Sequence, residues 1–177
     1  VIDDWYTKEE LKDTWSELDF YTNCQEKDKI LRADETIVAR DDLTDKSLAE
    51  SYRWYPNQFF TSEYKTMSSI HVNAKKFICQ ELHEEIKHLY PWYNMFTSTN
   101  VSSPMISYYE GGDYYKPHHD SFMYTVLIWV TKKPKIWTGG DLFLQPVENK
   151  EKKVLFKNNR AVIFPSMMTH AVSPIEW

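Results

Sequence analysis

The sequence predicts an α+β fold, in which helices in the first half of the chain precede an antiparallel sandwich or barrel in the second half. Two stretches within the first ninety residues carry apolar side chains at helical spacing. From Val101 onward, short runs of β-branched and aromatic residues alternate with turn residues. All four glycines lie in this second part, as the doublets Gly111-Gly112 and Gly139-Gly140, so the sharpest turns are expected there.

The first helix is predicted over residues 8–18. Thr7 and Glu10 stand three positions apart, as in a capping box, where each side chain binds the backbone N–H of the other residue. The apolar stripe of this helix consists of Leu11, Trp15 and Leu18. This spacing places all three side chains on one face, which we expect to be buried.

The next segment has weaker signals. Residues 22–42 are polar and charged, which predicts a loop with a strand or two near Thr36-Ile37-Val38. Thr44 is expected to cap a short helix carrying Leu48 and Tyr52.

The strongest helix is predicted over residues 72–89. Pro91 comes after it as a stop signal. Its apolar stripe consists of Ile78, Leu82, Ile86 and Leu89. Residues 1–100 are therefore interpreted as mainly helical support for the strands of the second half.

Six strands are predicted in the second half, over residues 105–109, 122–131, 141–147, 153–156, 161–164 and 169–173. Turn residues separate them, including one turn at 148–150 and another at Asn158-Asn159. Because no helix intervenes, the strands are expected to form an antiparallel sandwich or barrel. We expect residues 1–177 to form a single domain, with the barrel over 101–177.

Composition narrows the classes of protein. Lys and Arg number 21 against 26 Asp and Glu, a net charge of −5, and no basic block stands out, which argues against a nucleic-acid partner. No apolar run is long enough for a membrane span, so no membrane association is expected. Cys24 and Cys79 are interpreted as reduced thiols of a cytoplasmic protein. The sequence does not indicate an oligomeric state.

Three of the six histidines are set aside as surface residues. His83 and His88 superficially match a zinc-protease helix, but that motif needs its second histidine four positions after the first, where Lys87 stands. His71 lies outside any comparable motif.

The segment Pro117-His118-His119-Asp120 has metal-ligand spacing. In an extended strand, residues two apart point to the same face, so His118 and Asp120 can reach one point while His119 faces away. His170, on a later strand, can supply a third ligand. Two histidines and one carboxylate leave three positions open, as a non-haem Fe(II) oxygenase requires. An ordinary His–Asp hydrogen bond would explain His118 and Asp120 equally well, so on spacing alone both readings stay open.

The surrounding residues resemble a known family. The chain is similar to the Fe(II)/2-oxoglutarate-dependent dioxygenases of the prolyl 4-hydroxylase-like superfamily. The similar segments are 1–11 (VIDDWYTKEEL), 109–120 (YEGGDYYKPHHD), 137–144 (WTGGDLFL), 160–166 (RAVIFPS) and 170–174 (HAVSP). The resemblance implies a double-stranded β-helix, that is, a jelly-roll barrel, with N-terminal helices flanking its outer face.

The resemblance also implies a set of ligands. Fe(II) would be bound by His118, Asp120 and His170. The cosubstrates would be 2-oxoglutarate, which is converted to succinate, and O2, with ascorbate as an accessory reductant. Tyr109 stands where relatives place a tyrosine whose hydroxyl binds 2-oxoglutarate, although a buried core aromatic is an equally good interpretation.

Two departures from the family pattern matter. Asn158-Asn159 replaces a glycine in the turn before the strand that leads to His170, and asparagine tolerates the left-handed backbone that such a turn needs. In relatives, a basic residue nine or ten positions after the third ligand binds the far carboxylate of 2-oxoglutarate. Neither Lys157 nor Arg160 occupies that place, so we expect the group on a C-terminal strand beyond Trp177.

The resemblance implies hydroxylation of an unactivated C–H bond, with a prolyl residue of a peptide or protein as the leading substrate. Asp120 argues against the halogenase variant of the family, which has a small residue at this position. Two alternatives stay open. One is a hydroxylase of a free amino acid or small metabolite, and the other is a non-catalytic jelly-roll module that binds a metal or another protein.

Overall fold

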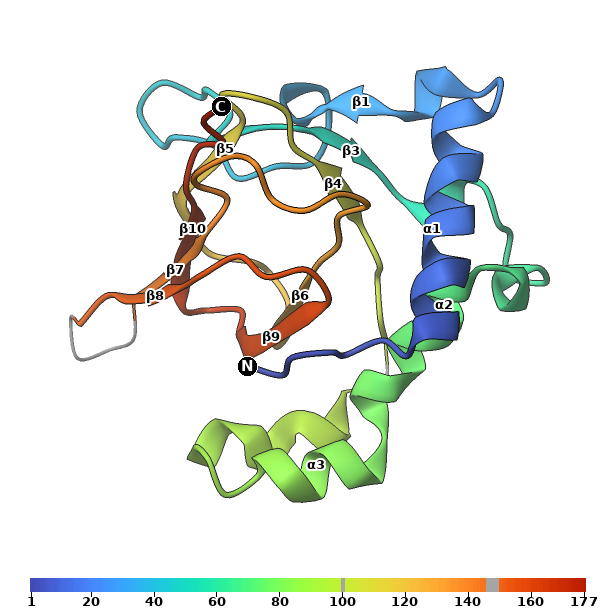
Figure 1. Ribbon diagram of the computed structural model, residues 1–177. Coiled ribbons are helices and arrows are strands. Elements are labelled where there is room, and N and C mark those ends of the chain that lie inside the picture. The colour runs from blue at the N-terminus through green and yellow to red at the C-terminus, as the bar shows by residue number, and fades with distance from the viewer. Residues whose placement is uncertain (100, 146–149) are drawn as a thin grey trace. The chain divides into compact units, whose positions relative to one another are not determined.

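The computed structural model describes residues 1–99, 101–145 and 150–177 (Figure 1). The end of the strand expected over 141–147, and most of the turn expected at 148–150, therefore lie outside the described residues. The chain divides into two compact units. A strand-rich unit comprises residues 1–6, 30–53 and 107–177, and a helix-rich unit comprises 7–29 and 54–106.

The helix-rich unit contains three α-helices, namely α1 (Lys8–Asn23), α2 (Ser69–Ala74) and α3 (Gln80–Ile86). Its 3-10 helices are η1 (Lys27–Lys29), η3 (Pro56–Gln58), η4 (Lys65–Met67), η5 (Lys75–Ile78) and η6 (Pro91–Ser98). None of the helices in the described part of the chain has the length and apolar character needed to cross a membrane.

Helix α1 begins as the sequence predicts. The Glu10 N–H donates to Thr7 Oγ1 at 3.2 Å, and the Thr7 N–H donates to Glu10 Oε2 at 2.8 Å, which completes the capping box. The helix continues beyond Leu18 to Asn23. The fully buried Tyr21, whose ring lies 4.7 Å from that of Phe59, accounts for the extension, because packing stabilises a helix end that propensity alone does not.

The single helix expected over residues 72–89 is wrong. The backbone tightens into the 3-10 turn η5 and becomes extended at Cys79, with φ −87° and ψ 149°. Cys79 then caps the next helix, because its Sγ accepts the Leu82 N–H at 3.5 Å. Leu82 is buried, whereas Leu89 at the end of the expected stripe is 70% exposed. The apolar residues keep their helical spacing across the break at Cys79, so the spacing alone does not reveal that the helix is interrupted.

The short helix expected after Thr44 is also wrong. Asp41 Oδ1 accepts both the backbone N–H and the hydroxyl of Thr44, at 2.8 and 2.7 Å, so this threonine is committed to a turn. Asp45 has a left-handed φ of 54°, which a helix starting here could not accommodate. The chain instead forms the strands β2 (Ala49–Glu50) and β3 (Tyr52–Trp54).

The strand expected near Thr36-Ile37-Val38 is likewise absent, and Ile37 is 94% exposed. The strand of this region is β1 (Leu31–Arg32), followed by the 3-10 helix η2 (Ala33–Glu35). Strand β1 pairs antiparallel with β3, and β4 (Ile106–Tyr108) joins them in a sheet of order β1-β3-β4.

The strands that follow β4, together with β2, form the other two sheets (Figure 1). The larger sheet has the order β2-β5-β10-β7-β8, and the smaller is the antiparallel pair β6-β9. These strands are β5 (Tyr114–His118), β6 (Tyr124–Trp129), β7 (Leu142–Gln145), β8 (Lys152–Val154), β9 (Arg160–Pro165) and β10 (Thr169–Val172). The predicted α+β class with antiparallel sheets is confirmed.

The core of the strand-rich unit takes side chains from both of these sheets. Its buried members are Trp129, Leu142, Leu144, Val162 and Phe164. Burying each large apolar side chain contributes roughly 1.5–3 kcal/mol. The core thus holds β7 of the larger sheet and the β6-β9 pair together.

Two backbone positions control the turns. Gly139 has φ 76°, and a Cβ built there would lie 1.6 Å from the carbonyl oxygen of Pro174, so only glycine fits. Asn159 has φ 60°, which confirms the left-handed turn expected there. Its side chain accepts the Tyr6 N–H and donates to the Tyr6 carbonyl, both at 2.8 Å, which ties the N-terminal segment to the turn before β9.

We expect Asn159→Ala to lower the free energy of unfolding by about 2–4 kcal/mol, because it removes two buried hydrogen bonds and strains a left-handed residue. Asn159→Gly loses the same bonds without the strain, so it should be less destabilising by roughly 1 kcal/mol. Urea denaturation of the three proteins measures both differences. Equal destabilisation by the two variants would show that backbone conformation at this position is unimportant.

Candidate metal centre

Antiparallel pairing of β5 with β10 places the two candidate histidines opposite each other. His118, the last residue of β5, is the register partner of His170 on β10. Their ring centroids lie 4.1 Å apart. Asp120 follows His118 by two positions, and its carboxylate oxygens lie 3.5 Å from His118 Nε2 and 3.4 Å from His170 Nε2. One ligand atom from each of the three residues lies within 4.8 Å of the others, as a single metal ion requires.

Backbone carbonyls orient both imidazoles. His118 Nδ1 lies 2.8 Å from the Lys116 carbonyl oxygen, and His170 Nδ1 lies 2.9 Å from the Met168 carbonyl oxygen. A carbonyl oxygen only accepts, so each Nδ1 carries the hydrogen and each neutral Nε2 has a free lone pair. Both Nε2 atoms face Asp120, which is the donor arrangement that a 2-His-1-carboxylate metal site needs.

A chain of hydroxyl groups holds the Asp120 carboxylate. Thr125 Oγ1 donates to Asp120 Oδ2 at 2.5 Å and is itself 2.8 Å from the hydroxyl of Ser166. Ser166 is fully buried, and its carbonyl accepts the Asp120 N–H at 3.0 Å. Both the side chain and the backbone of Asp120 are therefore fixed from β6 and the end of β9. Neither Thr125 nor Ser166 was expected at the site, although Ser166 ends the segment 160–166 that resembles the family.

The surroundings of Asp120 and His118 determine their protonation states. Burial by itself would raise the pKa of Asp120, but the contacts of its carboxylate with His118, His170 and Thr125 outweigh burial and hold that pKa well below its ordinary value. Burial lowers the pKa of His118, although the neighbouring Asp120 carboxylate opposes the change. An ionised carboxylate beside a neutral imidazole is the protonation state in which these groups bind a metal.

Aromatic rings enclose the histidines. Phe164, at 2% exposure, meets the His170 ring edge-on, with centroids 4.8 Å apart. The Tyr115 ring lies parallel to that of His118, at a centroid distance of 3.4 Å and an interplanar angle of 13°. Val172 is buried on the same face of β10 as His170. Apolar walls of this kind limit access of water to the group.

Tyr109 lies close to a buried arginine. Burial raises the pKa of Tyr109 to about 12, and the positive Arg53 guanidinium opposes this rise. The phenol is therefore protonated and can donate a hydrogen bond. Arg53, on β3, was not predicted, because the first hundred residues were interpreted as helical support.

The remaining histidines lie outside the group. His119 is exposed, as predicted, and its Nε2 lies 3.4 Å from the Thr169 hydroxyl. The surface position expected for His71 is wrong, because His71 is only 9% exposed and its burial lowers its pKa. Among the described residues, His118, Asp120 and His170 form the one cluster of three that could hold a metal ion.

Comparisons with known proteins bear on the family and the fold. Residues 104–177 match the 2OG-Fe(II) oxygenase superfamily. The crystal structure of a Pseudomonas putida prolyl-4-hydroxylase is similar over 99% of this chain and 84% of that chain, with a TM-score of 0.61 and 14% sequence identity. No curated protein matches the chain. The double-stranded β-helix expected from the sequence is thereby confirmed as the fold.

We expect Thr125→Val to weaken binding of Fe(II), or of Mn(II) as a stable substitute, by about tenfold, because Asp120 loses the hydroxyl that orients its carboxylate. Thr125→Ser keeps the hydroxyl and should restore the affinity. Thr131→Val, further along the same segment, serves as the matched control. Titration calorimetry under anaerobic conditions measures all four proteins, and unchanged affinity in Thr125→Val would contradict the role given to Thr125.

The His118 imidazole of the metal-free protein should titrate below its ordinary value of 6.5, because burial disfavours the charged ring. Asp120→Asn should lower this pKa further, since the negative carboxylate that favours the imidazolium is removed. Histidine side-chain NMR signals followed against pH report both values. A rise in the pKa on substitution would be incompatible with the contact between these residues.

Proposed function

We propose that the chain is a 2-oxoglutarate-dependent Fe(II) dioxygenase that hydroxylates a prolyl residue of a peptide or protein, and the match of residues 104–177 to the 2OG-Fe(II) oxygenase superfamily supports the reaction type. One observation carries the site assignment, namely the convergence of His118, Asp120 and His170 with each Nδ1 already bound to a carbonyl. The prolyl substrate rests on the similarity in fold to the Pseudomonas putida prolyl-4-hydroxylase.

The proposed roles of the residues derive from their surroundings. His118 and His170 would each supply Nε2, and Asp120 would supply a carboxylate oxygen, as the three protein ligands of Fe(II). When bound, Fe(II) supplies the oxygen chemistry that no amino-acid side chain can provide. Tyr109 would donate its hydroxyl hydrogen to 2-oxoglutarate. Phe164 and Val172 would exclude water from the reacting atoms.

The overall reaction balances without a further reductant. One 2-oxoglutarate and one O2 are consumed for each C–H bond, and the products are succinate, CO2 and the hydroxylated substrate. One oxygen atom enters the new carboxylate of succinate and the other enters the hydroxyl group. Ascorbate would be needed only to keep the iron ferrous between productive cycles.

Two further expectations, on domain organisation and on location in the cell, accompany this proposal. Residues 1–177 would act as one oxygenase domain. The protein would work in the cytoplasm, where the thiols of Cys24 and Cys79, which are both free, are stable.

Anaerobic addition of Fe(II) and 2-oxoglutarate to the protein should produce a weak visible charge-transfer band. His118→Ala should abolish the band, because an Nε2 ligand is lost, whereas His119→Ala, a control at the adjacent exposed position, should keep it. A band that survives in His118→Ala would refute the site assignment.

Exposure of the loaded enzyme to O2 with proline-containing peptides should release succinate in proportion to peptide that has gained one oxygen atom on proline, as measured by mass spectrometry. Free amino acids, assayed in parallel, represent the alternative of a small-molecule hydroxylase. Metal binding without the band or succinate release would instead favour the non-catalytic module.

A further inference from the structure

Two loops beside the candidate metal centre expose large apolar side chains. One loop, residues 119–123, joins β5 to β6, and the other, residues 166–168, joins β9 to β10. Phe122 and Met167 are each 63% exposed, and Met123 is 46% exposed. Single exposed apolar residues are ordinary, but several on neighbouring segments indicate a binding surface. These three residues are called the apolar rim below.

Backbone hydrogen bonds hold the two loops side by side. The Ser166 N–H donates to the Met123 carbonyl at 3.1 Å, and the Asp120 N–H donates to the Ser166 carbonyl at 3.0 Å. The first of these bonds extends the antiparallel register of β6 with β9. Phe122 and Met167 are the chain neighbours of Met123 and Ser166, so the apolar rim spans the contact between the loops.

The candidate ligands are accessible from the side of these loops. The Asp120 side chain is 29% exposed, whereas those of His118 and His170 are 2% and 5% exposed. Asp120 belongs to the loop that carries Phe122 and Met123. A substrate that approaches the ligands from solvent therefore meets the apolar rim.

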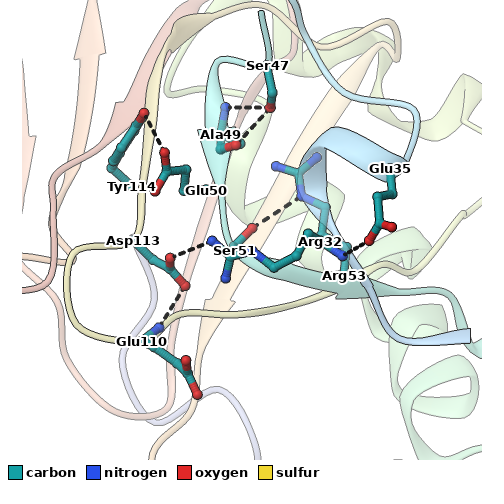
Figure 2. Close-up of polar contacts among 10 residues, drawn as sticks. All are labelled: Arg32, Glu35, Ser47, Ala49, Glu50, Ser51, Arg53, Glu110, Asp113 and Tyr114. Carbon is teal, nitrogen blue, oxygen red and sulfur yellow. Dashed lines mark hydrogen bonds and ion pairs between the residues drawn. The ribbon is translucent and has the colours of Figure 1, made fainter. Parts of the chain in front are cut away.

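The two ends of β5 differ in character. Near its first residue, Tyr114, charged side chains already have polar partners (Figure 2). Asp113 Oδ1 accepts from Arg32 Nη2 at 3.1 Å, and Glu50 accepts the Tyr114 hydroxyl at 3.3 Å. The loop after the last residue of β5 has Asp120, a candidate ligand, as its one charged residue. The end of β5 that bears the candidate ligands is thus the apolar one.

The composition of the apolar rim favours a peptide over a free amino acid. A free amino acid presents an ammonium and a carboxylate, and apart from Asp120 the two loops have no charged side chain to bind either. Two of the three rim residues are methionines, whose unbranched, polarisable side chains adapt to apolar groups of different shape. The ring of Phe122 adds a large apolar surface.

We propose that Phe122, Met123 and Met167 bind large apolar side chains of a peptide substrate, next to the residue that the peptide presents to the metal. This inference rests on the proposed function and names the substrate class more closely. The preferred peptide carries large apolar residues beside its target residue. Because methionine adapts its shape, the rim accepts several apolar residue types.

NMR of the methionine methyl groups tests the contact in the wild-type protein. The full chain is loaded with Zn(II), which binds without redox turnover, and is titrated with two proline-containing peptides. One peptide has leucine on both sides of the proline, and the other has serine at the same positions. The methyl signals of Met123 and Met167 should shift with the leucine peptide and not with the serine peptide. Met67 and Met95, which are exposed in the helix-rich unit, should not move with either.

Calorimetric titration of variants measures the contribution of the rim. Phe122→Ser and Met167→Ser should each weaken binding of the leucine peptide about tenfold, because each removes apolar surface that the peptide buries. The affinities for the serine peptide and for Zn(II) should stay unchanged. Ile136→Ser, which removes a 76% exposed side chain between β6 and β7, is the matched control and should bind the leucine peptide as the wild type does.

Several results would overturn the inference. They are equal affinity of the wild type for the two peptides, failure of the leucine peptide to bind, wild-type affinity in both rim variants, and signals of Met123 and Met167 that the leucine peptide leaves unmoved. These titrations involve no turnover. Absence of succinate release from the Fe(II)-loaded wild type would therefore count against the proposed function and is read separately.

Discussion

The antiparallel register between β5 and β10 is the constraint on which the candidate centre depends. It sets His118 opposite His170, although the two residues are far apart in the sequence. A shift of one residue would turn every side chain of the strand to the other face. β10 is also held on its other edge by β7, where His170 pairs with Leu144 and Val172 with Leu142, both of which are buried. Core packing therefore fixes the register that positions the ligands.

Polar groups around the centre differ in how fully they are satisfied. Each histidine Nδ1 has a carbonyl partner, and the Asp120 carboxylate has Thr125, so the three candidate ligands are held in place without a metal. Arg53 differs, because it is 2% exposed and its Nη2 has no hydrogen-bond partner among the residues that the structure describes. Satisfied groups maintain geometry, whereas a buried polar group without a partner needs an explanation of its own.

The first hundred residues show the limits of predicting structure from the spacing of apolar residues. The capping box at Thr7 was read correctly because all of its contacts are local. The long stripe over 72–89 was misread, because an extended residue at Cys79 re-caps the chain without disturbing the spacing of apolar residues. Thr44 has the character of a helix cap, yet Asp41 three positions earlier takes its hydroxyl for a turn. Competing side-chain contacts of this kind decide local structure and are invisible to pattern matching.

The sequence by itself determined the α+β class, most strands of the second half and the His118, Asp120 and His170 candidates. These features result from local rules, namely the alternation of strand faces, the chemistry of turns and the spacing of motif residues. Asn159 belongs with them, because a left-handed turn requires a particular residue type at one position. The tertiary structure decided which distant residues meet. Thr125, Ser166 and Tyr115 meet the ligand residues only through strand pairing and burial, and an isolated threonine in the sequence gives no sign of either.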